Sequence, residues 1–333
     1  MSELFTVDAA EALVRDVLLA SDVSPANAAS VARALVAAEI DGQKGHGFSR
    51  LAAYAAQARS GKVDGHAVPR ITRPFAAAIL VDAGNGFAFP AIDAAIDALA
   101  ETTPETGIAM AGIRRSHHCG QLGAHVERLA ERGLIALMVA NSPEAMAPWG
   151  GSRAVFGTNP IAFATPREGA APLVIDLSLS KVARGRIMAA AQAGQAIPEG
   201  WALDAGGRPT TDPTAALAGT MIPLGDAKGA ALALVVEILS ATLIGANHAF
   251  EASSFFDAEG PPPGVGQTII AFRPGVAGYG ARLETLLGAI LSQEGTRLPG
   301  AGKAAARRRA AEAGLEITEE RLREIRALVP GTR

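Results

Sequence analysis

A histidine and an arginine lie four positions apart near the start of the chain, in the segment GHGFSR at residues 45–50. The glycines beside His46 let backbone or a ligand approach closely, and the spacing puts Arg50 on the same helical face. A histidine exchanges a proton near neutral pH, and an arginine fork holds a carboxylate through two hydrogen bonds. The pair predicts a substrate carrying a carboxylate beside a C=N or C=O bond. A surface histidine and arginine at a helix start is the alternative.

A second cluster is the turn SHHCG at residues 116–120, expected between a strand and a helix. Free amide groups at such a turn attract phosphate, so His118 and its neighbours are candidates for cofactor or substrate binding, with ordinary turn chemistry as the alternative. Adjacent histidines rarely point at one ion, and Cys119 is the only cysteine. We therefore expect no metal site.

Three weaker candidates follow along the chain. Thr158 and Asn159 precede a proline and could bind a ligand or form an ordinary turn. Asp176 ends a buried strand, a position favoured for ligands in α/β folds, but it could equally cap the next helix. Lys228 lies between glycines in PLGDAKG, where it could meet phosphate or belong to a plain turn.

The elements that would position these residues follow from caps and periodicity. Thr6, and Ser24 followed by Pro25, are expected to start the first two helices. Further helices are expected at 48–58, 92–99, 120–132, 181–193, 230–246 and 304–313, and strands at 77–81, 108–113, 134–140, 173–175 and 268–272. Residues 201–213 are expected to form a loop, and the apolar helix at 230–246 is expected to be buried. The three arginines at 307–309 are interpreted as a solvated face.

The order of these elements predicts an α/β protein with a discontinuous helical domain, residues 1–75 plus 285–333, and an α/β cofactor-binding domain, residues 76–284. Gly84-Asn85-Gly86 and 278–280 lack the third glycine of the dinucleotide fingerprint, so the α/β domain is expected to be non-Rossmann. There is no Walker motif.

Composition excludes several classes of protein. The formal net charge of -3 and the 5% aromatic content argue against nucleic-acid binding. The first residues have no apolar signal region, and the most apolar stretch, residues 230–246, contains Glu237 and is too short to cross a membrane. These features predict a cytoplasmic protein with no membrane contact.

Six motifs in register carry a resemblance to a known family. They are GHGFSR, SHHCG, FGTNPIAFATPR, VIDLSLSKVARG, GRPTTDPTAALAG and PLGDAKG. In this order, from about residue 41 to residue 245, they resemble the type-2 malate/L-lactate dehydrogenase family. Within it, the segments around GHGFSR, VDAGNGFAFPA and SHH are most similar to reductases of Δ1-piperideine-2-carboxylate and Δ1-pyrroline-2-carboxylate.

The resemblance implies a non-Rossmann domain with a mixed, largely antiparallel sheet, a homodimer, and NADPH as cofactor with NADH as the alternative. It implies that His46 is the proton donor and that Arg50 and Thr158 bind substrate. It also implies the following cofactor contacts: His118, Cys119, Gly120, Gln121, Leu122, Asp176, Leu177, Ser178, Gly225, Lys228, Leu298, Pro299 and Gly300. For the 2′-phosphate, Lys303 and the arginines at 307–309 are candidates.

The activity expected from this resemblance is reduction of a cyclic imino acid, giving L-proline or L-pipecolate. The alternative is an NAD(P)-dependent 2-hydroxy-acid dehydrogenase of the malate/L-lactate type that acts on a 2-oxo acid. The chain departs from the imine reductases at two positions. Gly45 stands where the imine reductases often have serine, and Arg186 where they have a catalytic aspartate. Arg186 would lower the pKa of His46 if it came close. Family members that act on open-chain keto acids tend to carry a basic residue in this region, so the Arg186 departure favours the alternative. A catalytically silent relative that binds a metabolite is the third interpretation, which Gly45 and Arg186 together favour.

Overall fold

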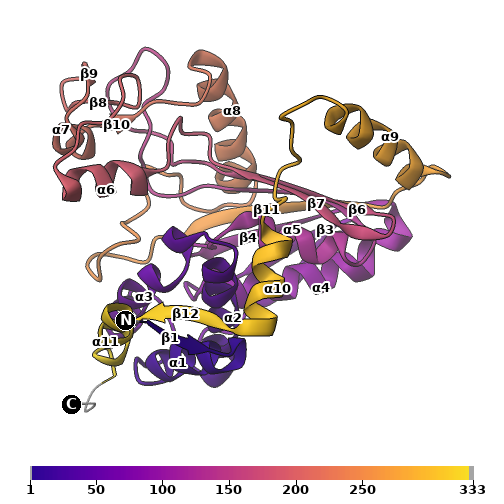
Figure 1. Ribbon diagram of the computed structural model, residues 1–333, viewed down its shortest axis with the longest axis horizontal. Helices are drawn as coiled ribbons and strands as arrows, with labels where there is room; N and C mark the ends of the chain where they lie inside the picture. Colours follow the sequence, from indigo (N-terminus) through magenta and orange to yellow (C-terminus); the bar gives the residue numbers. More distant parts are fainter. Residues whose placement is uncertain (1, 330–333) are drawn as a thin grey trace.

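A seven-stranded sheet forms the centre of the computed structural model, which describes residues 2–329. Its strand order is β2-β3-β4-β11-β5-β6-β7 (Figure 1). The strands are β2 (Arg70–Phe75), β3 (Ala78–Asp82), β4 (Ile108–Ser116), β5 (Ile135–Ala140), β6 (Ile161–Arg167), β7 (Ala170–Leu177) and β11 (Val265–Phe272). Within this sheet β3 and β4 pair in parallel, and the other neighbouring pairs are antiparallel. The prediction of a mixed, largely antiparallel sheet is confirmed.

Two helices, α4 (Ala88–Thr106) and α5 (Leu122–Ala130), cover one face of this sheet (Figure 1). Alternate strand residues such as Ile79, Val81 and Ile113 point toward them and are fully buried, as the two-residue period of a strand requires. On the helices, Ile92 and Ile96 meet these strand residues in one apolar cluster. The main core therefore lies between the sheet and these two helices.

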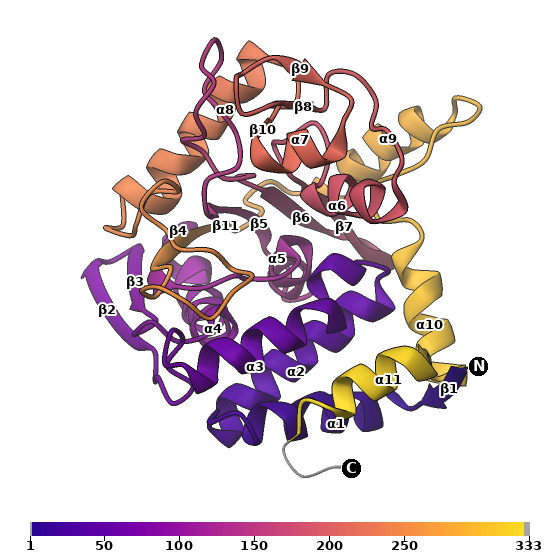
Figure 2. The same cartoon turned by 90° about the vertical axis from the view of Figure 1, so that its left-hand side faces the viewer.

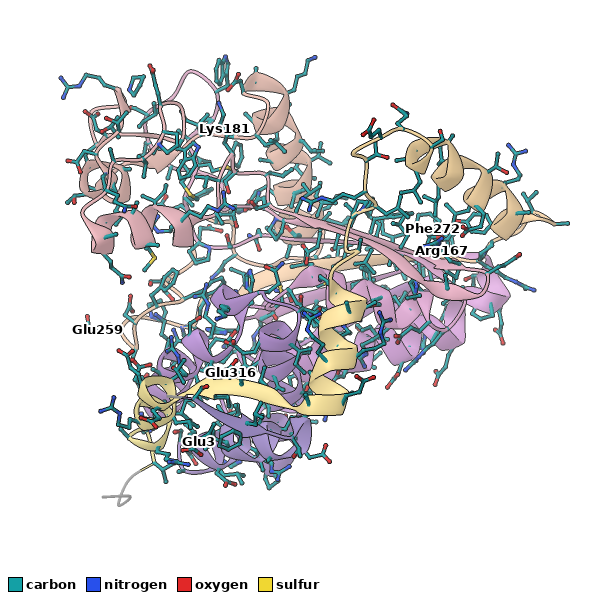
Figure 3. All side chains as sticks on the ribbon, viewed as in Figure 1. Glu3, Arg167, Lys181, Glu259, Phe272 and Glu316 are labelled. Atoms are coloured by element: carbon teal, nitrogen blue, oxygen red, sulfur yellow. The ribbon has the colours of Figure 1, made fainter. Side chains whose placement is uncertain are left out.

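The opposite face carries α8 (Ala227–Glu237), which continues through a π-helical turn at Ile238–Thr242, and α9 (Tyr279–Leu291) (Figure 1). Arg167 on β6 holds α9 through Glu284, with two nitrogen–oxygen distances of 2.8 Å (Arg167 is labelled in Figure 3).

The predicted burial of the apolar helix is wrong. Leu232, Leu234, Val235 and Ile238 have exposed fractions between 42% and 48%. The segment is apolar on every face, but one face alone packs on the sheet, so the other side chains point outward.

A helical layer contains α1 (Val7–Leu19), α2 (Pro25–Ile40), α3 (Leu51–Arg59) and α11 (Glu319–Arg326). The predicted caps are confirmed, because Thr6 accepts a hydrogen bond from Ala9 N and Ser24 accepts one from Asn27 N. β1 (Ser2–Phe5) pairs antiparallel with β12 (Leu315–Thr318) beside α1 and α11 (Figure 2). The first and last described parts of the chain thus lie in one layer.

The remaining elements are small. A three-stranded sheet joins β8 (Ala202–Leu203), β9 (Pro209–Thr210) and β10 (Thr220–Met221), with α6 (Arg184–Ala193) and α7 (Pro213–Ala218) beside it (Figure 2). Residues 201–213, predicted as loop, therefore contain two short strands. α10 (Lys303–Ala313) packs against α2. The division into domains at residues 75 and 284 stays a prediction, with β2 pairing into the central sheet. Within residues 2–329, no helix has both the length and the apolar character to cross a membrane.

Candidate functional site

His46 and Arg50 lie on two short 3-10 helices, η1 (Lys44–His46) and η2 (Phe48–Arg50), between α2 and α3. Gly47 joins them, and a Cβ there would overlap the carboxylate of Glu39. That carboxylate accepts a hydrogen bond of 2.7 Å from Phe48 N. A side chain at position 47 would therefore displace Glu39 and disturb this hydrogen bond, whereas position 45 has open space around it and would accept a serine.

The ring of His46 belongs to a buried hydrogen-bonded cluster. Its Nδ1 lies 3.2 Å from Nε2 of His118, and Nδ1 of His118 lies 2.5 Å from the hydroxyl of Tyr54. The two imidazoles are stacked, with centroids 5.2 Å apart. His118 and Tyr54 are buried. Since Nδ1 of His46 faces His118, Nε2 is the ring nitrogen left to meet a substrate.

Burial and charge keep these rings neutral. Burial, and then the nearby Arg50 guanidinium, lower the pKa of His46 to about 4. The same two causes hold the pKa of His118 well below its usual value. Burial raises the pKa of Tyr54, so its hydroxyl stays protonated. Arg50 is the cation that lowers the pKa of His46. Arg186, which was expected to lower this pKa if it came close, is exposed on α6.

The guanidinium of Arg50 uses only part of its hydrogen-bonding capacity within residues 2–329. Nε donates a 2.8 Å hydrogen bond to Gly45 O, while the guanidinium carbon lies 4.6 Å from the centroid of the Phe256 ring. Nη1 is buried and has no hydrogen-bond partner within residues 2–329. A buried unpaired donor is costly, and an anionic ligand beside His46 would satisfy it.

The predicted cofactor turn comes directly before α5. Gly120 has a φ of +67°, and a Cβ there would lie 3.2 Å from the ring of Phe89, so this position requires glycine. Gly123 N donates a 2.7 Å hydrogen bond to the carboxylate of Asp176. His118 and Cys119 are buried as whole residues, and their contact with a cofactor stays a prediction.

The late segment at residues 298–300 joins the same region. A Cβ on Gly300 would lie 3.3 Å from Val174 O, two residues before Asp176. Lys303, at the start of α10, donates to the side chain of Gln121 over 3.2 Å. The fold thus brings together the turn before α5, the end of β7, and the segment that contains Leu298, Pro299 and Gly300.

Backbone hydrogen bonds link the other candidates. Leu179 N donates to Thr158 O over 2.8 Å, and Leu224 N donates to Leu179 O over 2.7 Å. These bonds make neighbours of Thr158, the segment after Leu177 and Ser178, and the PLGDAKG loop. Gly225 lies on an exposed turn, and Lys228 is exposed in the first turn of α8. Asn159 instead donates to the buried carboxylate of Glu237 over 2.9 Å. Its role is to hold α8.

Two contacts of this site were not predicted. Tyr54 bonds His118, and Phe256 packs on Arg50. Tyr54 stands eight residues after His46 and four after Arg50, so the helical period could have placed it on the same face. Nothing near Phe256 in the sequence indicates its position. No cluster of residues suited to a metal ion occurs within residues 2–329.

A hollow of about 350 Å³ lies away from His46, between α2, α4, α5 and α10. Its lining includes Gln121, Asp93 and Arg128, and the last two form an ion pair with an N–O distance of 2.5 Å. Its arginines are ion-paired, Arg33 and Arg128 with Asp93 and Arg307 with Glu127, whereas Arg50 at the His46 site retains an unpaired donor.

Comparison with known proteins gives a consistent family and a divided set of activities. The family described as Malate/L-lactate dehydrogenase matches residues 5–326. A (2R)-3-sulfolactate dehydrogenase (NADP(+)) of Chromohalobacter salexigens is 53% identical over 98% of each chain. A Δ1-pyrroline-2-carboxylate/Δ1-piperideine-2-carboxylate reductase of Pseudomonas putida is 38% identical over 96% of this chain and 95% of its own.

Among solved structures, the Δ1-piperideine-2-carboxylate reductase of Pseudomonas syringae pvar. tomato has a TM-score of 0.93 and 36% identity, covering 98% of this chain and 99% of its own. The fold is thus that of a solved imine reductase, although a sulfolactate dehydrogenase is more similar in sequence. The expectation of cyclic imine reduction is wrong, because the 53% identical relative is a hydroxy-acid dehydrogenase. GHGFSR and SHH, on which that expectation relied, form the buried site and do not distinguish a C=N from a C=O substrate.

Proposed function

Because the chain belongs to the malate/L-lactate dehydrogenase family, we propose that it is an NADP-dependent 2-hydroxy-acid dehydrogenase, with 3-sulfolactate as the first substrate to test. The observation that carries this proposal is the 53% identity to a sulfolactate dehydrogenase over 98% of each chain. Arg186 supports it, since the family resemblance associates a basic residue in that region with members that act on open-chain oxo acids. The sulfonate of 3-sulfolactate would give such a cation a second anion to bind.

The proposed chemistry uses two groups beside α3, the guanidinium of Arg50 and the Nε2 atom of His46. Arg50 binds the carboxylate of the hydroxy acid with the fork of its guanidinium, of which Nη1 is buried and unpaired within residues 2–329. His46 accepts the proton of the 2-hydroxyl at Nε2, and bound NADP⁺ supplies the acceptor for the hydride that leaves C2. The products are the 2-oxo acid, NADPH and one proton. Positioned proton transfer of this kind contributes about 10²- to 10⁴-fold to the rate.

The residues before α5 fit a dinucleotide phosphate. The helix has nine residues, and its amino end carries the positive end of the helix dipole. Lys303 is bonded to Gln121 and Asp41, and Arg307 to Asp41 and Glu127. Of the predicted 2′-phosphate contacts, the proposal therefore keeps Arg308 and Arg309, which are exposed on α10.

The test is an absorbance assay with the purified full chain. NADP⁺ is supplied with each enantiomer of 3-sulfolactate, with L-malate and with L-lactate, and NADPH is supplied with Δ1-pyrroline-2-carboxylate. We expect NADPH formation from a hydroxy acid, with sulfolactate giving the highest kcat/KM. Turnover of the imine as the fastest reaction, or no turnover of any substrate, would refute the proposal.

Arg50→Lys sharpens the test. Lysine keeps the charge but loses the two-pronged geometry, so KM for the hydroxy acid should rise at least about 10-fold, the equivalent of about 1.4 kcal/mol. Arg59→Lys is the matched control. Arg59 is also an arginine whose guanidinium donates a hydrogen bond, of 2.9 Å to the hydroxyl of Ser21, but it lies outside the site. An unchanged KM in Arg50→Lys would remove Arg50 as the carboxylate anchor.

We also propose that the chain forms a homodimer through α8. The exposed Leu232, Leu234, Val235 and Ile238 supply an apolar face, and such faces commonly mark interfaces. Light scattering after size-exclusion chromatography should give twice the mass of one chain for the wild type. The Val235→Glu variant should give the mass of a single chain. A monomeric wild type would reject this proposal.

A further inference from the structure

Within residues 2–329, His46 has no carboxylate partner of the kind that usually orients a catalytic histidine. In many enzymes a carboxylate holds the second ring nitrogen and fixes the tautomer. Here the second nitrogen, Nδ1, faces the imidazole of His118 at 3.2 Å, and His118 faces the Tyr54 hydroxyl at 2.5 Å. The charged and titratable groups around this cluster are Arg50, His117, Cys119 and, further away, Lys62. None of the groups named here is a carboxylate.

We propose that Tyr54 and His118 are positioning residues that fix the tautomer of His46, with both histidines protonated at Nδ1 in the resting enzyme. Its catalytic meaning rests on the proposed dehydrogenase function. The hydrogen bonds then run in one direction: Nδ1–H of His46 donates to Nε2 of His118, and Nδ1–H of His118 donates to the Tyr54 oxygen. The Tyr54 hydroxyl lies 3.5 Å from the carbonyl oxygen of His118, which accepts from it.

This direction leaves the useful nitrogen free. With Nδ1 of His46 protonated, Nε2 carries the lone pair that takes the proton from the substrate hydroxyl. The opposite direction, with both rings protonated at Nε2, would present an N–H to that hydroxyl and block the transfer. Opposite tautomers on the two rings would place two donors or two acceptors 3.2 Å apart. The two histidines must therefore share one tautomer.

Burial makes this control effective. His118 and Tyr54 are closed to solvent, at 8% and 0% exposure, so water cannot replace either partner. The Tyr54 hydroxyl keeps its proton in this surrounding. It can therefore accept from His118 without itself becoming charged. A neutral hydrogen-bonded chain of this kind orients His46 but does not stabilise its protonated form. The substrate carboxylate provides that stabilisation, because it neutralises the charge of Arg50.

The chain offers a matched pair of variants, since it contains two tyrosines. Tyr54→Phe removes the terminal hydroxyl of the cluster. Tyr279→Phe removes a hydroxyl with an equally short contact, 2.5 Å to Thr165 Oγ1, at the start of α9. Nitrogen-15 spectra of histidine-labelled enzyme report the protonated nitrogen of each ring, and kcat, KM and the pH profile are measured on the same samples.

In the wild type we expect Nδ1–H on both His46 and His118. In Tyr54→Phe we expect His46 to change to Nε2–H, with kcat lower by about 10²-fold and KM for NADP⁺ unchanged. Tyr279→Phe should match the wild type in both readouts. Unlike tautomers in the wild type, or an unchanged His46 tautomer or kcat in Tyr54→Phe, would overturn the proposal. If Tyr54→Phe does not fold, the wild-type spectrum decides. If the wild type oxidises no hydroxy acid, the proposed function fails, while the spectrum still tests the hydrogen-bonded chain.

Discussion

Two charged regions flank the loop at residues 41–50 and differ in how well their groups are paired. At one end, the carboxylate of Asp41 is 1% exposed and receives two 2.7 Å hydrogen bonds from Arg307. Arg307 also bonds Glu127 twice at 2.8 Å. At the other end, Nη1 of Arg50 and both ring nitrogens of His117 are buried without a partner within residues 2–329.

The difference separates a structural region from a reactive one. Asp41 joins α2 to α10 and, through Arg307, to α5, so its hydrogen bonds fix the three helices around the loop. The Arg50 region keeps unsatisfied donors that a ligand can use, and such groups are commonly found at functional sites. The predictions below test this separation, from the largest effect to the smallest.

His46→Ala should abolish most of the activity and leave stability nearly unchanged. Its loss removes the proton acceptor, so kcat should fall about 10²- to 10⁴-fold. Stopped-flow or steady-state kinetics and thermal unfolding on the same sample give both quantities. His66→Ala is the control, because His66 is an exposed histidine 3.1 Å from Asp22. A fall in melting temperature without a fall in kcat would show that the two regions share one role.

Asp41→Asn should do the reverse. It leaves Arg307 with one carboxylate partner, and loss of a hydrogen bond to a charged group costs about 1.5–3 kcal/mol of stability. Urea unfolding measures the loss, and kcat at a temperature where the variant is folded should stay near the wild-type value. Asp22→Asn, at an exposed aspartate, is the control. A stable Asp41→Asn with low kcat would place Asp41 in the reactive region.

The two regions should also lose stability in different pH ranges. Burial lowers the pKa of His117 to about 3, below the usual 6.5. Stability from keeping it neutral is therefore complete above pH 6.5 and is lost as pH falls toward 3. Burial acts to raise the pKa of Asp41, but Arg307 and Lys303 outweigh it and the net pKa is lowered. Its contribution is complete above its usual 3.8 and is lost below that pH.

His117→Leu isolates the first range. The wild-type His117 takes up one proton when the chain unfolds in this pH range, and leucine does not. The slope of unfolding free energy against pH between 5 and 6 should therefore fall by about 1.4 kcal/mol per pH unit. Urea unfolding at closely spaced pH values measures the slope, with His66→Gln as control. An unchanged slope in His117→Leu would mean that His117 is charged in the folded chain.

The sequence was most informative where local pattern decides structure. Caps at Thr6 and Ser24 follow from local hydrogen bonding, and glycine at position 47 marks a close backbone approach. The partners of Asp41 could not be predicted, because Arg307 is 266 residues away. That arginine was interpreted as part of a solvated helix face, yet only Arg308 and Arg309 of the three are exposed.

The activity was harder to predict than the fold for a related reason. His46 and Arg50 serve any substrate with a carboxylate beside a reducible carbon, so their motif indicates a site without its substrate. The pairing of His118 with Tyr54 depends on the packing of α3 against the end of β4, which no short motif encodes. Arg186, treated as a departure, was the residue that favoured the dehydrogenase alternative.

The pairing of β1 with β12 has a consequence for the order of folding during synthesis. Ser2 pairs with Thr318, and the apolar cluster of α1–α3 includes Ile317, Leu322 and Ile325. The helices α1–α3 therefore lack part of their core until residues 315–325 have left the ribosome. Contacts so distant in sequence form slowly, and exposed apolar surface promotes aggregation meanwhile. The central sheet, whose strands lie within residues 70–272, can form before the helical layer that was synthesised ahead of it.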